Sequence, residues 1–138
     1  MADHGFLLWQ SIEARLLAAA PVAGGWHATR LEKPNYPVGY FDLTQSVPVR
    51  GQAYYREEHE GLISVFSRQT RNGVLTPEEA FRLSYDALVA LQGGVPSIAP
   101  GFEITKFSCG RMIPRQVEAS WGRQFFFTAI THEVITNG

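Results

Sequence analysis

Residues 61–67 read GLISVFS, and residues 76–94 read TPEEAFRLSYDALVALQGG. The first stretch is apolar and rich in β-branched residues, with partial period-two alternation, which predicts a strand covered on at least one face. The second has the start, length and end of a helix. Between them, the polar loop 68–73 ends in the Asn-Gly turn signal. This strand, loop and helix form the framework around which the remaining segments can be placed.

The start of the predicted helix follows the rules of N-terminal capping. Thr76 can accept a hydrogen bond from a free backbone N–H, Pro77 stands where its missing N–H costs nothing, and Glu79 can reach back to the cap. Residues at i, i+4, i+7 and i+10 should then form the buried face of the helix. These are Phe81, Tyr85, Leu88 and Leu91.

Length and composition describe one ordinary globular domain, residues 1–138. Hydrophobic residues make up 45% of the chain and charged residues 18%, and the formal net charge is −1. This balance argues against sequence-independent binding to nucleic acid or to an anionic membrane. Cys109 is the only cysteine, so an intrachain disulfide is excluded, and we expect a reducing compartment. No segment has the pattern of a signal peptide or the length of a membrane span.

The rest of the chain supplies a second helix and further strands. Leu8, Ile12 and Leu16 form one stripe of a helix over residues 6–20, with Asp3 as its cap. Strand patterns cover residues 26–31, 38–44, 102–107 and 123–134. Gln45 to Tyr55 and Met112 to Gly122 are expected to be long connections. The order predicts an α+β fold, with a four- or five-stranded mostly antiparallel sheet, two helices packed on one face, and long loops between strand pairs.

Candidate catalytic and metal-binding groups are sparse. Cys109 and His132 lie on neighbouring predicted strands, but nothing around the cysteine would lower the pKa of its thiol, so a buried structural cysteine is favoured. Glu57 and His59 share a strand face without a third ligand at a suitable spacing, which favours a hydrogen-bonded pair over a metal site. We therefore predict no enzyme activity, no metal and no cofactor.

The two long connections carry apolar and aromatic residues of the kind found in interface cores. Two interpretations remain open: the connections fold back over the core of the domain, or they contact other subunits. In the first connection these residues are Val47, Pro48, Val49, Tyr54 and Tyr55, and in the second they are Met112, Ile113, Pro114 and Trp121.

Taken together, the elements resemble the tail terminator, or tail completion, proteins of long-tailed bacteriophages and gene transfer agents. The resemblance covers nearly the whole chain but depends on element order and apolar positions, and it departs from the family in the two long connections. It is carried by Leu8-x3-Ile12-x3-Leu16 with Gly24-Gly25, by Asn35-Tyr36-Pro37, by the strand 62–67, by the helix 80–91 and by the closing strand 125–129.

The resemblance implies a virion protein at the junction of tail and head, made in the bacterial host cytoplasm. Such a protein forms a ring, commonly of six copies, which caps the tail tube, stops its polymerisation and joins the head connector. Its partners are itself, the tail tube protein and the head connector protein, with no membrane and no sequence-specific nucleic acid, although the ring leaves room for DNA to pass. The alternatives are another neck or head-closure protein, or a small cytoplasmic ligand-binding or enzymatic α+β domain.

Within this interpretation, two groups of residues are predicted to form contacts. A heterologous contact between complementary patches closes a ring when the rotation between copies is right. The predicted contact residues are Tyr54, Tyr55 and Arg56 in one group, and Arg111, Met112, Ile113, Arg115 and Trp121 in the other.

Overall fold

The first helix begins at the predicted cap. In the computed structural model, which describes residues 3–49, 55–117 and 119–133, helix α1 spans His4–Ala19, and the Phe6 N–H donates to Asp3 Oδ1 at 3.1 Å. Leu8, Ile12 and Leu16 are fully buried, as the sequence pattern predicts. Neither α1 nor the second helix, within the described part of the chain, is long and apolar enough to cross a membrane.

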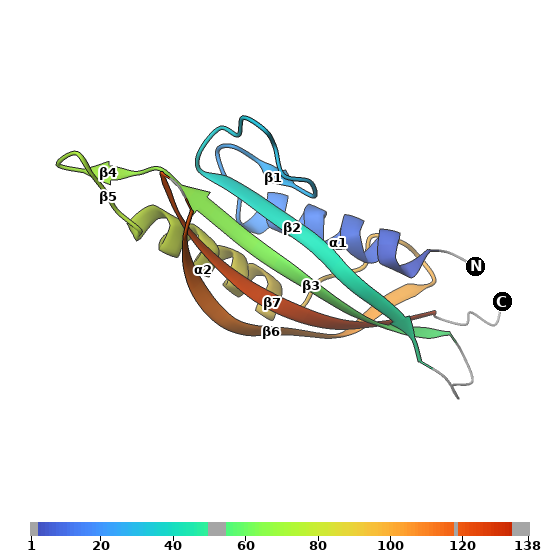
Figure 1. Cartoon of the computed structure of the whole chain (residues 1–138). Coiled ribbons are helices and arrows are strands. Elements are labelled where there is room, and N and C mark those ends of the chain that lie inside the picture. The colour runs from blue at the N-terminus through green and yellow to red at the C-terminus, as the bar shows by residue number, and fades with distance from the viewer. Residues whose placement is uncertain (1–2, 50–54, 118, 134–138) are drawn as a thin grey trace.

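A five-stranded sheet forms the body of the molecule, with strand order β1-β2-β3-β7-β6 (Figure 1). The short strand β1 is parallel to β2, and all other neighbours are antiparallel. The sheet is thus mostly antiparallel, which confirms the predicted fold class. Its strands are β1 (Trp26–His27), β2 (Val38–Pro48), β3 (Arg56–Ser67), β6 (Phe102–Val117) and β7 (Ser120–Glu133).

Both helices pack on the same face of this sheet, behind it in Figure 1. Helix α2 spans Glu78–Gln92, and its buried face agrees with the predicted one only in part: Leu91 is fully buried and Leu88 packs against the core, but the aromatic positions are not buried. The side chain of Tyr85 is 56% exposed, whereas the intervening small and aliphatic residues are buried. Small side chains let the helix axis approach the sheet closely, and this close packing outweighs the aromatic periodicity. The buried residues are Ala80, Leu83, Ser84, Ala87, Ala90 and Leu91.

The start of α2 follows the prediction in part. Thr76 Oγ1 accepts a hydrogen bond from the Glu78 N–H at 3.4 Å, as predicted, although the N-cap position itself is Pro77, which makes no side-chain cap hydrogen bond. Instead of reaching back to the cap, the Glu79 carboxylate accepts a hydrogen bond from Ser67 Oγ at 2.7 Å. The helix start is therefore attached to the end of β3.

The expectation of two long connections is wrong for the described residues. Gln45–Pro48 continue β2 and pair with Glu57–Glu60 of β3. Residues 112–117 continue β6, and β7 begins at Ser120, so a short turn joins the two strands. Pro114 suggested a loop, but β6 is an edge strand, where proline is tolerated. A register shift between Cys109 and Met112 marks a bulge that the strand pattern does not reveal.

The predicted polar loop 68–73 belongs to a small hairpin. Strands β4 (Thr70–Arg71) and β5 (Val74–Leu75) pair with each other and not with the main sheet. Asn72 and Gly73 have φ values of 53° and 76°, as a tight hairpin turn requires. The hairpin projects from one end of the molecule as an arm (Figure 1).

Candidate assembly surfaces

Two residues of the first predicted contact group, Tyr55 and Arg56, lie where β3 and β7 meet α1. Tyr54 lies outside the described residues. Tyr55 is half-buried, and its ring contacts His4 edge to face, with 4.8 Å between the ring centroids. A hydrogen bond with Glu57 is the main cause that raises the pKa of Tyr55. Arg56 begins β3 opposite His132. Tyr55 is therefore partly committed to contacts within its own subunit.

A chain of polar side chains lies beneath Tyr55. Thr131 Oγ1 is hydrogen-bonded to His4 Nδ1 and to His59 Nε2, each at 2.8 Å, and His59 Nδ1 is hydrogen-bonded to Ser46 Oγ at 2.7 Å. Burial lowers the pKa of His59, and the neighbouring His4 also lowers it. Four elements, α1, β2, β3 and β7, are thereby joined at one point. The sequence offered no signal for this, because its members are far apart along the chain.

The second predicted group lies on strands and not on a loop. Arg111 and Arg115 are exposed on the edge strand β6, and Ile113 between them is 40% exposed. Met112 instead packs against the main core. Trp121 lies on β7 opposite Ser67 and is half-buried. The structure therefore keeps three residues of this group on or near an open sheet edge and turns Met112 inward.

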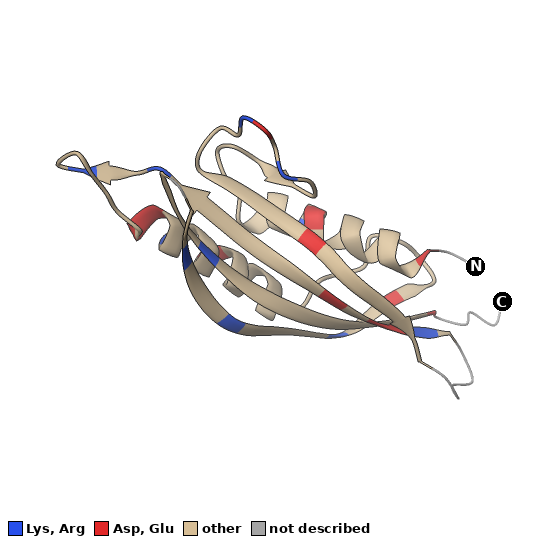
Figure 2. Cartoon of the chain, in the orientation of Figure 1, with Lys and Arg blue, Asp and Glu red and all other residues tan. Residues whose placement is uncertain are grey.

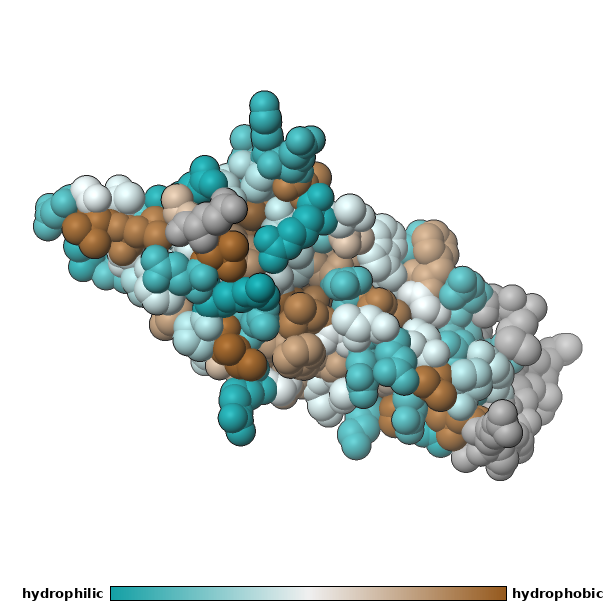
Figure 3. Space-filling view, in the orientation of Figure 1, coloured by the Kyte–Doolittle hydropathy of each residue, from teal (hydrophilic) through white to brown (hydrophobic). Residues whose placement is uncertain are grey.

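Among the described residues, none forms a second layer over the centre of the sheet face opposite the helices. Phe126 on β7 is 51% exposed there, and Figure 3 shows hydrophobic residues in the middle of this face. Asp42, Arg30 and Arg115 line a hollow of about 310 Å³. We call this surface the open face. Acidic residues lie along strands β2 and β3, and basic residues lie along β6 (Figure 2).

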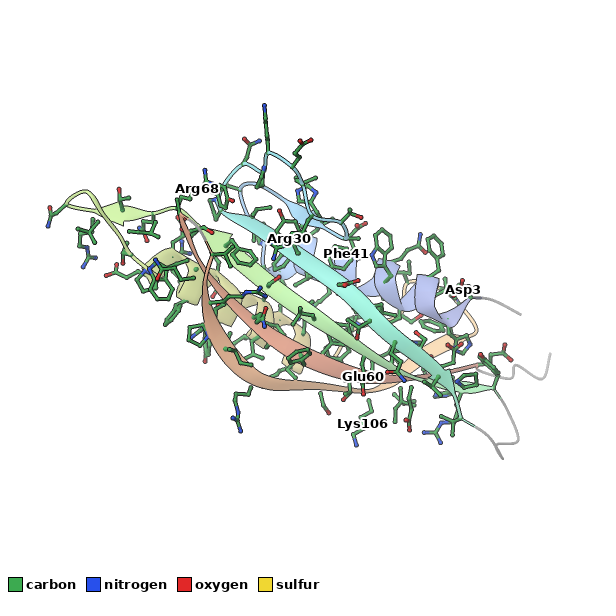
Figure 4. All side chains as sticks on the ribbon, viewed as in Figure 1. Asp3, Arg30, Phe41, Glu60, Arg68 and Lys106 are labelled. Carbon is green, nitrogen blue, oxygen red and sulfur yellow. The ribbon has the colours of Figure 1, made fainter. Side chains whose placement is uncertain are left out.

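One end of the open face carries a basic pocket that sequence reasoning missed. The loop between β1 and β2, residues 28–37, lies beside the end of β3, and Figure 4 places Arg30 and Arg68 at this end of the sheet. The pocket holds about 350 Å³. Residues 26–31 read as a strand in the sequence, which concealed the loop that brings the basic residues together.

The candidate thiol and imidazole are not brought together. Cys109 pairs in register with Phe127, and His132 lies five residues further along β7, on the opposite face, roughly 16 Å away at the usual strand rise. Burial raises the pKa of the Cys109 thiol to about 11, which disfavours the reactive thiolate. Within the described residues, no group of three or more His, Cys, Asp or Glu could hold a metal ion.

Comparisons with known proteins show a likeness to a solved structure. No protein-family model and no curated protein matches the chain. The fold is similar to that of a chain in a solved structure described as the "Virion of native gene transfer agent (GTA) particle", with a TM-score of 0.63 and 15% sequence identity. The likeness covers 96% of this chain and 99% of that chain. At this identity, it establishes a shared fold over nearly the full length of both chains.

Proposed function

We propose that this protein is a structural subunit of a phage-like particle. The observation that carries the proposal is the likeness to a gene transfer agent virion chain over 96% of this chain and 99% of that one. A match of this extent leaves little of either chain outside the common fold. The proposed location is accordingly the virion.

The finer proposal is a tail terminator: a ring of six copies that caps the tail tube and joins it to the head connector. The element order and the apolar positions of the sequence support this assignment within the broader class. The proposed role is geometric and involves no catalysis, in keeping with the separation of Cys109 from His132 and with the raised pKa of the thiol.

Ring closure needs two different surfaces on each subunit. We propose that Ile113 and Arg115 on the open face, with Arg111 on the same edge strand, form one of them. Tyr55 and Arg56 at the other end of the sheet belong to the second, together with Tyr54, which lies outside the described residues. Trp121 and Met112 support the first from within the subunit. The exposed edge of β6 adds backbone groups that can pair with a neighbour.

The test is to determine the mass and shape of the purified protein, alone and with tail tube protein. Light scattering should give a multiple of the subunit mass, and negative-stain images should show rings with a central hole. Added to polymerising tube protein, the rings should shorten the tubes and appear at one end. A monomer at high concentration that leaves tube length unchanged would contradict the proposal. Rings that bind only a head-side component would instead indicate another neck protein.

A further inference from the structure

The basic pocket has an excess of positive charge that the rest of the molecule does not share. Arg30, Lys33 and Arg68 line it, with Glu32 as the one carboxylate among its lining residues. The whole chain has a formal net charge of −1. Like charges placed this close repel one another, so a pocket of this kind is stabilised when an anion occupies it.

Aromatic rings hold two of the cations in place. The Arg30 guanidinium carbon lies 5.0 Å from the centroid of the Phe66 ring and 5.5 Å from that of Tyr40. The Arg68 guanidinium carbon lies 4.2 Å from the centroid of the Tyr36 ring. A stacked guanidinium keeps its N–H donors at its edge, so both groups remain able to bind an anion in a bidentate manner.

Within the described part of the chain, the ion pairs use other residues. They join Arg71 to Glu78, Arg82 to Asp86, and His132 to Glu103. The pocket cations are therefore not neutralised by any described carboxylate within 4.0 Å.

The chemistry of the pocket favours a carboxylate over a nucleic acid. Proteins that bind single strands stack bases on open aromatic faces. Here the residues Tyr40 and Phe66 are only 8% and 3% exposed, and the Arg30 guanidinium lies over both of their rings.

We propose that the basic pocket binds an acidic segment of a partner protein, with Arg30 and Arg68 receiving carboxylates and Lys33 adding charge at the rim. The proposal is independent of the ring described above, because it concerns a ligand that one subunit can bind.

The test measures binding of a fluorescent oligoglutamate peptide by anisotropy, with an oligothymidylate and an oligolysine peptide as comparisons. The wild-type protein should bind oligoglutamate most tightly, and added salt should weaken the binding. Replacing both Arg30 and Arg68 by Gln should weaken it at least about tenfold, because two charge-assisted contacts are lost. Arg82→Gln is the matched control: its side chain is 65% exposed on α2, and it should bind as the wild type does.

Lys33→Gln guards against a folding artefact. Lys33 is exposed, so its loss should leave the circular dichroism spectrum and the melting temperature unchanged while still reducing the affinity. If oligoglutamate does not bind the wild type, or binds all these variants equally, the proposal is wrong. Tighter binding of oligothymidylate through the same residues would also overturn it, in favour of nucleic acid. Neither result depends on whether the protein forms rings.

Discussion

At the scale of single residues, His59 should make stability depend on pH. Burial lowers its pKa below the usual 6.5, so the unfolded chain binds more protons than the folded chain as the pH falls through that value. The stabilising contribution is therefore full above the unfolded pKa and is lost as the pH falls toward the lower, folded pKa. Glu57 opposes the shift, and His4 adds to it.

We expect His59→Gln to reduce the free energy of unfolding by about 1–3 kcal/mol at neutral pH, because it disturbs the hydrogen bonds to Ser46 and Thr131. The difference between wild type and variant should shrink as the pH is lowered from about 8 to about 5, which urea unfolding at several pH values would measure. A difference that stays constant over this range would show that His59 does not titrate as proposed.

Gly61 is required by a close approach at the centre of the sheet. A Cβ atom there would collide with the ring of Phe127 and with the backbone oxygen of Asp42. Gly61→Ala should therefore cost about 1–3 kcal/mol, as overpacking in a core usually does. At Gly93, where φ is −72° and a Cβ would meet no atom within 4 Å, the same change should stay within about 0.5 kcal/mol. Equal effects in thermal unfolding of the two variants would contradict this packing.

At the scale of elements, the rotation of α2 can be tested by a pair of substitutions. Ala87 is fully buried, and Leu in its place should destabilise the protein by about 1–3 kcal/mol. Tyr85 is 56% exposed, so Tyr85→Lys should change the stability by less than about 0.5 kcal/mol. Chemical denaturation of both variants checks the prediction. The reverse order of effects would restore the helix face predicted from aromatic spacing.

The sequence predicted those elements whose signals are local. The stripe of Leu8, Ile12 and Leu16 and the Asp3 cap depend on contacts within a turn or two, and both are found. The length of β6 was missed because Gly110 and Pro114 resemble breakers, and only the pairing with β7 shows that the strand continues past them. The sequence also could not show which residues of α2 face the core, because this depends on how the helix packs on the sheet.

The candidate surfaces likewise contain some residues that the sequence could identify and others that it could not. Composition pointed to Ile113 and Arg115, and both are exposed on the edge strand. It could not separate them from Met112, because which side chain faces the core depends on the bulge in β6. The basic pocket combines Arg30 with Arg68, which are distant in sequence and come together only through the fold.

At the scale of the whole molecule, the two faces of the sheet differ in how they are covered. Helices α1 and α2 cover one face and, with it, form the main core. The centre of the open face has no such cover, and Phe126 is 51% exposed there. Because helices cover only one face of the sheet, the other face keeps exposed apolar area that a second copy can bury. A charged residue introduced on the open face should therefore weaken association between copies more than one introduced elsewhere.

Phe126→Glu should therefore abolish the proposed self-association in light scattering and remove the proposed rings from negative-stain images. Val89→Glu is the matched control, because Val89 on the outer side of α2 is also 51% exposed and lies on the opposite side of the molecule. Both variants should keep the wild-type circular dichroism spectrum, since neither side chain belongs to the core. If Val89→Glu dissociates the assembly and Phe126→Glu does not, the subunits contact one another through their helices. The open face would then be available to bind another protein.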